Sequence, residues 1–385
     1  MASKLTVVVI GAAVAGIKVS HGLLKQVPSV RVILINPHKD YYFNIASPRV
    51  MAKPDAFPDN QYLLPIEDAF SNYPAHSFQF IQGTVTDIEP ESKQVVIAGS
   101  KVSLISYDYL VVASGSTTSA TIGKESALVP FKATVSGSLA SAIKEAQEAI
   151  QKANSIIIGG AGAVGVEFAG ELAEAWAGRG EKSPSISLVP ATEHVFPRLN
   201  DAAGMAAERL LKEKGVQLLL SRKVTKSEQD QAAKKWIVTL DSGEVLTADL
   251  YVSTTGVTPN SSFIPSIFLD KDGWLEVDDQ LRVQAAVNDG KCTIYALGDI
   301  TSHPYRDGYR ITDQVPVIVT NLKSEITGRG RRATYSPSDK AMAIVPVGKS
   351  GGTGQFGSWV PWSFLVAFLK GRDFFISRAS SFIRE

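Results

Sequence analysis

The sequence of 385 residues predicts an α/β fold built on two parallel β-sheets, and three observations carry this prediction. An unbroken run of apolar and β-branched residues at 5–10 is typical of a strand buried on both faces, and a glycine-rich turn and a helical stretch follow it. The same order recurs from Ser155 onward, and from about Thr334 the composition shifts to proline, glycine and aromatic residues. We therefore expect two Rossmann-like dinucleotide-binding domains and a small C-terminal α+β module.

The first unit begins with the strand at 5–10 and ends with a second buried strand at 30–35. Two such strands joined through a helix form a β-α-β unit, which is parallel and right-handed. The turn between strand and helix has the pattern G-x-A-x-x-G at Gly11, Ala13 and Gly16. In the dinucleotide fingerprint, the first glycine allows the tight turn, the second allows the backbone to approach the pyrophosphate, and the third allows close packing. Ala13 stands at the position of the second glycine, and its methyl group leaves less space between the backbone and a pyrophosphate. The alternative interpretation is that this turn is purely structural and binds no nucleotide.

The second strand ends at Asn36, a position where dinucleotide sites carry an acidic residue. A carboxylate accepts hydrogen bonds from both ribose hydroxyls, whereas the amide of Asn36 is uncharged. We therefore expect Asn36 to make a weaker or different contact with the ribose.

The second unit has a complete G-x-G-x-x-G pattern at Gly160, Gly162 and Gly165. Its expected strand, turn, helix and second strand lie at 155–158, 159–165, 166–177 and 185–189. Its second strand is followed by no acidic residue, because the sequence at 189–191 is Val-Pro-Ala. The pattern predicts a nucleotide site but does not distinguish NADH from NADPH, and a structural turn is again the alternative.

Shorter β-branched segments surround the two units. They are expected as strands at 79–86, 94–98, 217–220, 236–240 and 250–254, with a hairpin turn at 241–243. Two dinucleotide sites in one chain indicate electron transfer between a resident and an exchanging cofactor.

Three further segments resemble stretches of flavin-binding domains. They are Y-D-Y-L-V-V-A-S-G-S at 107–116, S-T-T-G-V-T-P-N at 253–260 and Y-A-L-G-D at 295–299. With the glycine turns, they make the chain similar to the two-dinucleotide-binding flavoproteins of the pyridine nucleotide–disulfide reductase fold over residues 5–321. The chain has a single cysteine, Cys292, and therefore no C-x-x-C pair, so reduction of a disulfide is excluded.

Within that group, the chain resembles the second apoptosis-inducing-factor branch, the ferroptosis-suppressor type of NAD(P)H:quinone oxidoreductase. Three patterns carry this closer resemblance: Asn44 with Arg49, the segment G-V-E-F-A-G-E at 165–171, and K-G-R-D-F-F at 370–375.

The resemblance implies FAD as the resident cofactor. The residues expected to bind it are Gly11, Ala13, Gly16, Asn36, Arg49, Val85, Ala113, Gly115, Gly256, Asp299 and Val315. Arg49 would counter the charge of the pyrophosphate, Val85 would meet the adenine through its backbone, and Asp299 would hold the ribityl chain. Val315 belongs to a helix expected to begin near Gln314, whose positive end would point at the flavin.

The resemblance also implies NADH or NADPH as the exchanging cofactor, held by Gly160, Gly162 and Gly165. It assigns two catalytic residues, Glu167 and Lys370, the second of which would place a positive charge near the flavin. We place Glu167 in the first turn of the second helix, where a carboxylate that only stabilises the helix terminus is the alternative. For Lys370 the alternative is a solvated lysine in a charged tail.

The predicted domain plan is discontinuous, because flavin-type motifs occur on both sides of the second glycine turn. It consists of the first half of the FAD-binding domain at 1–116, the NAD(P)H-binding domain at 117–256, the second half of the FAD-binding domain at 257–325 and a C-terminal module at 326–385.

Composition excludes several other classes of protein. The chain has 39 Lys and Arg residues against 38 Asp and Glu residues, a net charge of +1, so a nucleic acid partner is not expected. Its five histidines show no metal-ligand spacing, so no metal site is expected. The lone cysteine indicates an intracellular, cytoplasmic protein, and no segment predicts a transmembrane helix.

The C-terminal tail is rich in aromatic residues. Eight lie between residues 356 and 382: Phe356, Trp359, Trp362, Phe364, Phe368, Phe374, Phe375 and Phe382. Basic residues alternate with them, a pattern that predicts peripheral contact with a membrane such as the mitochondrial outer surface or a lipid droplet. The alternative is that the rings pack as the core of the C-terminal module.

We expect an FAD-dependent oxidoreductase that passes a hydride from NAD(P)H to the flavin and electrons onward to a quinone-type acceptor. Two other functions stay open: a redox-sensing, apoptosis-factor-like signalling flavoprotein, and a reductase of a protein electron carrier. The latter would need a basic surface for an acidic partner. Basic runs are limited, since Arg329, Arg331 and Arg332 form only a short cluster that is typical of a solvated loop.

Overall fold

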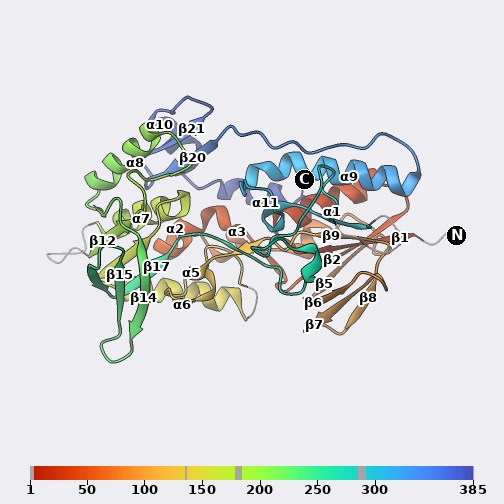
Figure 1. Ribbon diagram of the computed structural model, residues 1–385, viewed down its shortest axis with the longest axis horizontal. Coiled ribbons are helices and arrows are strands. Elements are labelled where there is room, and N and C mark those ends of the chain that lie inside the picture. The colour runs from red at the N-terminus through yellow and green to blue at the C-terminus, as the bar shows by residue number, and fades with distance from the viewer. Residues whose placement is uncertain (1–3, 135–136, 178–183, 285–291, 385) are drawn as a thin grey trace.

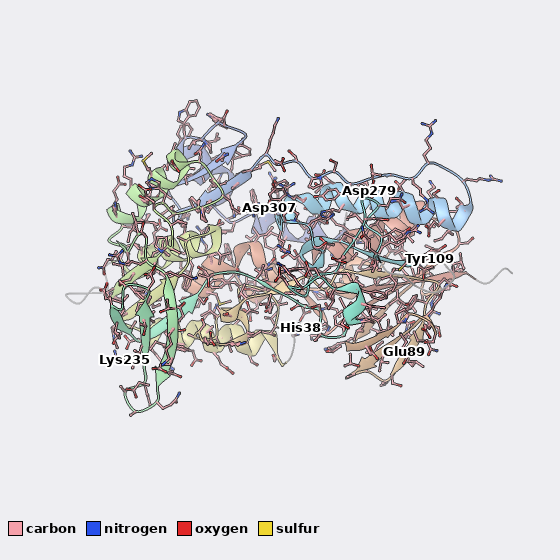
Figure 2. All side chains as sticks on the ribbon, viewed as in Figure 1. His38, Glu89, Tyr109, Lys235, Asp279 and Asp307 are labelled. Carbon is pink, nitrogen blue, oxygen red and sulfur yellow. The ribbon has the colours of Figure 1, made fainter. Side chains whose placement is uncertain are left out.

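The computed structural model describes residues 4–134, 137–177, 184–284 and 292–384. Two units, each with a parallel sheet, lie next to each other along the long axis of the molecule (Figure 1). Glu89 and Tyr109 lie in the unit at one end and Lys235 in the unit at the other, with His38 between them (Figure 2). The predicted α/β class with Rossmann-like parallel sheets is confirmed.

The first sheet has five parallel strands in the order β19-β9-β1-β2-β5. In chain order these are β1 (Leu5–Ile10), β2 (Val30–Asn36), β5 (Phe78–Gln82), β9 (Tyr109–Val112) and β19 (Ile294–Ala296). Because side chains alternate along a strand, Val7 and Val9 face one core cluster while Val8 and Ile10 face another.

Different elements cover the two faces of this sheet. Helices α1 (Val14–Gln26) and α9 (Ile311–Thr327) pack together in the cluster that holds Val7 and Val9. The antiparallel strands β6 (Thr84–Glu89), β7 (Gln94–Ala98) and β8 (Leu104–Ser106) close the other face.

The second sheet has four parallel strands in the order β13-β12-β11-β17. These are β11 (Ser155–Gly159), β12 (Ser185–Val189), β13 (Gln217–Leu218) and β17 (Leu250–Ser253). Helix α7 (Ala163–Trp176) follows β11. The antiparallel strands β14 (Val224–Asp230), β15 (Lys235–Leu240) and β16 (Val245–Ala248) pack against the sheet through Trp236 and Val238.

The chain passes from the first unit to the second and back through two short paired strands. These are β10 (Ser116–Thr117) and β18 (Thr258–Pro259), which run antiparallel with Ser116 opposite Pro259. Two reciprocal hydrogen bonds between Ser114 and Asn260 hold the same crossing together, at 2.8 and 2.9 Å. The predicted boundaries at 116 and 257 fall at this crossing, and the domain plan itself stays a prediction.

The C-terminal part of the chain, residues 342–384, which we call the tail, contacts both units. Its hairpin, β20 (Met342–Pro346) and β21 (Gly352–Phe356), lies beside α7 and α8 (Asp201–Glu213) of the second unit. It continues through α10 (Ser363–Val366), a π-helical turn at Ala367–Gly371 and α11 (Ala379–Arg384). Helix α11 packs on α1 of the first unit, where the ring of His21 bonds to the carbonyl oxygen of Ile383 at 2.8 Å. The tail therefore joins the two units.

Several expected elements differ from the structure. The helix expected at 166–177 is α7 at Ala163–Trp176, and the strand expected at 217–220 is β13, which ends at Leu218. The strand expected at 79–86 is wrong as a single element, because Gly83 divides it between the parallel sheet (β5) and the antiparallel sheet (β6). The helix expected to begin near Gln314 begins at Ile311, since the 3₁₀ turn Gly308–Arg310 starts the helical chain earlier.

Candidate functional site

Helices α1 and α7 begin within the glycine-rich turns, at Val14 and Ala163, shortly after the carboxyl ends of β1 and β11. Their N-cap residues are Ala13 and Gly162, and neither helix has a side-chain cap. The first N–H groups of a helix have no partner within it and carry the positive end of its dipole. Two long, uncapped helix starts at the ends of parallel strands are suited to bind phosphate groups.

The flanking glycines of both turns are required by close backbone approach. A Cβ atom on Gly11 would lie 2.4 Å from the carbonyl oxygen of Ala113, and one on Gly16 would lie 1.8 Å from that of Gly11. In the second turn, a Cβ on Gly165 would lie 2.4 Å from the carbonyl oxygen of Gly160. Both turns therefore have the steric construction that the fingerprint predicts.

The middle position of each turn faces open space. Ala13 is exposed, and a Cβ atom on Gly162 would meet nothing within 4 Å. The cradles in front of α1 and α7 thus have room for a pyrophosphate, and the residues present fit two dinucleotides. Gly115 and Gly256, at the crossing between the units, also adopt positive φ angles (69° and 60°) and have open space where a Cβ would lie.

Asn36 supports the first turn. Its Oδ1 accepts a hydrogen bond from the backbone N–H of Ala12 at 2.9 Å, and its Nδ2 donates to the carbonyl oxygen of His38 at 2.8 Å. A carboxylate could make only the first of these bonds, because it has no N–H to donate. This pair of bonds explains an amide at this position. The predicted ribose contact stays a prediction.

Asp299 lies in a polar cluster beside the crossing. Its carboxylate accepts hydrogen bonds from Ser116 Oγ at 2.8 Å and from Lys132 Nζ at 2.7 Å. The N–H of Gly298 donates to Gln314 Oε1 at 2.8 Å, which ties this turn to the start of α9 beside Val315. Lys132 lies in a loop that belongs to no sequence motif, so no local pattern indicates its contact with Asp299.

Val85 lies on β6 and is buried, 6% exposed, among the side chains that close the first sheet. Its backbone pairs with Ile97, and the strand is irregular between Val85 and Asp87. The predicted backbone contact with adenine stays a prediction.

The two residues predicted to be catalytic, Glu167 and Lys370, are in direct contact. Lys370 Nζ donates to Glu167 Oε1 at 2.6 Å, and the two side chains are 13% and 4% exposed. Lys370 is therefore not a solvated lysine. Glu167 is the fifth residue of α7, so its placement in the first turn was wrong, because α7 begins at Ala163. Burial raises the pKa of Glu167, and the ammonium of Lys370 opposes that rise.

Arg49 has its partners within the protein. It lies on α2 (Ser47–Ala52) and is bonded to both carboxylate oxygens of Glu171 at 2.8 Å. It also donates to the carbonyl oxygens of Gly371 and Arg372 at 2.7 and 2.9 Å. Its predicted role toward the pyrophosphate stays a prediction.

The aromatic residues of the tail divide into two groups. Phe374 is fully buried, and Phe356, Phe375 and Phe382 are half-buried. The outward-facing group, which we call the aromatic surface, consists of Trp359, Trp362, Phe364, Phe368 and Leu369. Its four rings are 46% to 68% exposed, so the core interpretation holds for only part of the tail.

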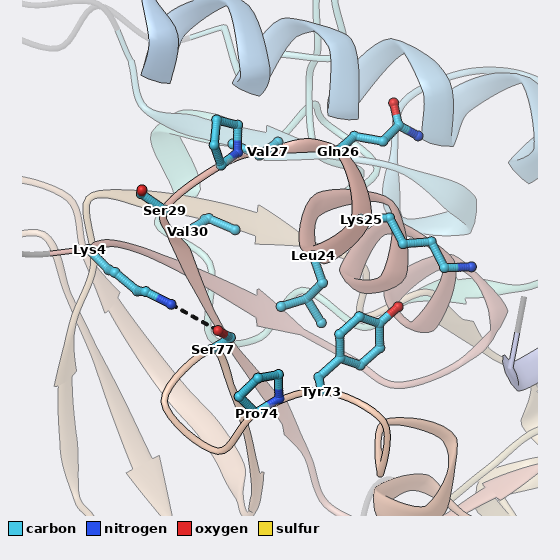
Figure 3. Close-up of a pocket in the computed structure, with 11 residues that line it drawn as sticks. Lys4, Leu24, Lys25, Gln26, Val27, Ser29, Val30, Tyr73, Pro74 and Ser77 are labelled. Atoms are coloured by element: carbon cyan, nitrogen blue, oxygen red, sulfur yellow. Dashed lines mark hydrogen bonds between the residues drawn. The ribbon is translucent and has the colours of Figure 1, made fainter.

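A separate cavity of about 320 Å³ lies at the opposite end of the first sheet (Figure 3). Lys4, Val30, Tyr73 and Ser77 are among the residues that line it, and Lys4 Nζ donates to Ser77 Oγ at 2.9 Å. Because Lys4 and Val30 mark the amino ends of β1 and β2, this cavity is distinct from the candidate nucleotide sites.

Within the described ranges, no three His, Cys, Asp or Glu side chains lie close enough together to hold a metal ion. No helix in the described part of the chain has both the length and the apolar character needed to cross a bilayer.

Comparison with known proteins places the chain in a family. Residues 5–321 match the family model for pyridine nucleotide-disulphide oxidoreductases. The chain is 32% identical to the oxidoreductase ptaL of Pestalotiopsis fici over 371 residues, which cover 94% of this chain and 95% of ptaL. It is 27% identical to ferroptosis suppressor protein 1 of Xenopus tropicalis over 388 residues, 97% of this chain and 94% of that protein.

The fold agrees with that of a solved member of the same structural class. The sulfide:quinone oxidoreductase of Aquifex aeolicus superposes with a TM-score of 0.76 at 17% identity, covering 98% of this chain and 92% of that one. The two glycine turns, the parallel sheets and the matched sequence agree: the chain belongs to the pyridine nucleotide-disulphide oxidoreductase family.

Proposed function

We propose that this oxidoreductase is an FAD-dependent NAD(P)H:quinone oxidoreductase. The observation that carries the proposal is the pair of uncapped helix starts at Ala13 and Gly162, with a buried ion pair between Glu167 of the second helix and Lys370 of the tail. When bound, FAD supplies the ring that accepts a hydride from NAD(P)H and releases electrons to an acceptor.

The chain binds and orients the two nucleotides. The first N–H groups of α1 hold one pyrophosphate and those of α7 hold the other. Asp299 accepts hydrogen bonds from ribityl hydroxyls, and Lys132 keeps that carboxylate in place through its 2.7 Å bond. The chain thereby supplies proximity, which is the main requirement of hydride transfer between two bound rings.

Lys370 provides a positive charge in a site with little water. A fixed cation stabilises negative charge that arrives with a hydride, and it does so more strongly when it is buried than in water. Glu167 holds the ammonium at 2.6 Å and thereby fixes its position.

The proposal also includes a quinone as the electron acceptor and contact of the protein with a membrane. The resemblance to the ferroptosis-suppressor branch supports a quinone acceptor. The aromatic surface supports contact with a bilayer, because three of its four rings contact one another in series: the ring centroids of Trp359 and Trp362 lie 6.2 Å apart and those of Trp362 and Phe364 5.9 Å apart. Arg372 lies 5.4 Å from the Phe368 ring and adds a positive charge, as expected of a surface that contacts anionic lipid.

Steady-state turnover with NADH or NADPH against a panel of quinones tests this function. We expect turnover with a lipid-soluble quinone, near the usual enzyme median of about 10 s⁻¹. Turnover below about 0.01 s⁻¹ with every quinone would contradict the proposal and favour the redox sensor. A rate that depends on an acidic protein carrier and falls steeply with salt would favour the carrier reductase. Such a carrier would need a positively charged surface on this chain. Arg332 adds little net positive charge to that surface, because it is paired with Glu325 at 2.7 Å.

A further inference from the structure

A buried cluster holds the backbone of the tail immediately after Lys370. We call it the tail clamp and define it as the Arg49 and Glu171 side chains with the carbonyl groups of Gly371 and Arg372. Arg49 Nε and Nη2 bond to the two oxygens of Glu171, Nη2 also donates to Gly371, and Nη1 donates to Arg372. Four of the five N–H groups of this guanidinium thus have acceptors in the described structure.

We propose that Arg49, fixed by Glu171, is a positioning residue that sets the location of Lys370 against Glu167. This inference rests on the proposed function, in which Lys370 provides the buried charge. It assigns Arg49 an action through the tail backbone, in addition to any contact with a phosphate.

The geometry of α7 links the two ion pairs. Glu167 and Glu171 are four residues apart on this helix and therefore face the same side. Glu167 binds the side chain of Lys370, while Glu171 binds the arginine that holds the next two carbonyl groups. The Lys370 ammonium and the backbone of the two residues after it are thereby tied to one face of α7, and the ammonium also donates to the carbonyl oxygen of Ile344 at 3.3 Å.

The local backbone of the tail explains why an external support is needed. Residues 367–371 form a π-helical turn, and Phe374 and Phe375 follow with φ angles of 52° and 61°. A π turn and two consecutive left-handed non-glycine residues are each unfavourable conformations, which persist only where surrounding contacts impose them.

Phe374 is part of the same packing. Its ring is fully buried and lies 4.7 Å from the Arg49 guanidinium carbon and 5.4 Å from Lys370 Nζ. The ring is therefore in cation–π contact with both cations. Movement of Arg49 would alter the packing against which Lys370 rests.

The test uses the FAD-loaded full chain and two variants of the clamp. Arg49→Lys keeps a positive charge for Glu171 and for any phosphate, but it loses the fork that reaches two carbonyl groups and a carboxylate together. Glu171→Gln keeps Arg49 itself but leaves it one acceptor oxygen in place of two, and it also removes the ion pair of Glu171 with Lys53, at 2.8 Å. The matched control is Glu325→Gln, because Glu325 pairs with Arg282 and Arg332 in another half-buried cluster.

The main measurement is the rate of flavin reduction by NADH in a rapid-mixing experiment, with flavin content determined on the same samples. We expect both clamp variants to retain flavin and to reduce it more slowly, by up to about 100-fold, which is what displacement of a catalytic group by about 1 Å can cost. Hydrogen exchange of residues 367–376 should rise in both variants and stay unchanged in the control.

A double-mutant cycle separates positioning from a general structural effect. In a Lys370→Ala background, each clamp variant should slow flavin reduction less than about twofold further, because the group that the clamp positions is gone. Full additivity, unchanged rates in both clamp variants, or loss of flavin at unchanged rate would overturn the inference.

Failure of the proposed function gives a different result. If Lys370→Ala alone reduces flavin as fast as the wild type, the assigned role of Lys370 is wrong, and the clamp has nothing to position. If Lys370→Ala is slow but the clamp variants are fast, only the inference about Arg49 fails.

Discussion

Replacement of Lys370 by methionine tests the buried ion pair through the pH dependence of stability. The substitution keeps an unbranched side chain that is one atom shorter and leaves the 4% exposed Glu167 without its nearest cation. The other charged groups near Glu167 are Glu171, which repels it, and Arg49, which is bonded to Glu171. Removal of one partner of a buried pair costs about 3–5 kcal/mol while the remaining group stays charged.

Glu167 can avoid this cost by binding a proton, and this sets the sign of the pH dependence. Burial already raises the pKa of Glu167, so its contribution to folding is fully present below its unfolded pKa and is lost as the pH rises through its folded pKa. Loss of Lys370 raises the folded pKa further. We therefore expect a small destabilisation near about pH 5, which grows toward about 3–5 kcal/mol at about pH 8.

Thermal unfolding of the flavin-loaded protein at several pH values measures this effect, with Lys214→Met as the control. Lys214 pairs with Glu174 at 2.8 Å, and Glu174 keeps a second lysine, Lys53, at 2.9 Å. Burial by itself would raise the pKa of Glu174. The hydrogen bonds from Lys214 and Lys53 outweigh burial and lower this pKa to about 2. The Lys214→Met control should therefore lose at most about 1 kcal/mol of the free energy of unfolding, and this loss should be the same at about pH 5 and at about pH 8. A Lys370→Met loss that does not increase with pH would refute the reasoning.

Three further predictions concern the nucleotide sites and the tail. Asp299→Ala should weaken FAD binding about 10- to 150-fold, since it removes a charged acceptor worth about 1.5–3 kcal/mol, and full flavin retention after gel filtration of dilute protein would contradict this. Gly162→Val should fill the open space in front of α7, so that FAD stays bound while reduction by NAD(P)H slows; loss of flavin instead would mean that the two sites are reversed. Wild type should float with anionic liposomes at low salt, whereas Trp362→Ser with Phe364→Ser should not, and Ile267→Ser, at a 70% exposed apolar residue outside the tail, should float as the wild type does. Wild type that stays at the bottom would contradict the membrane contact.

Local sequence patterns were sufficient to predict the sheets and the two turns. The strands at Leu5–Ile10, Gln94–Ala98 and Ser185–Val189 have the expected bounds, because runs of β-branched residues define them without help from distant contacts. The third glycine of each turn is equally local, since a Cβ on Gly16 or Gly165 would meet the carbonyl oxygen of the first glycine of its own turn.

The contacts made by the tail could not be predicted in this way. Glu167 and Lys370 were both singled out, yet their contact joins residues that are 203 positions apart and depends on how the tail crosses α7. Lys132 was missed for a related reason, because its interest comes from Asp299, 167 positions away. Asn36 was assigned only to the ribose, since its bond to the Ala12 N–H requires the folded turn.

The most direct test of the account is an anaerobic titration of the purified protein with NADH and with NADPH, followed in the visible absorption spectrum. We predict a yellow protein whose flavin band is bleached by about one equivalent of at least one of the two nucleotides, because two dinucleotide sites in one chain bring nicotinamide and flavin together. A colourless protein, or a flavin band that neither nucleotide bleaches, would contradict the central claim.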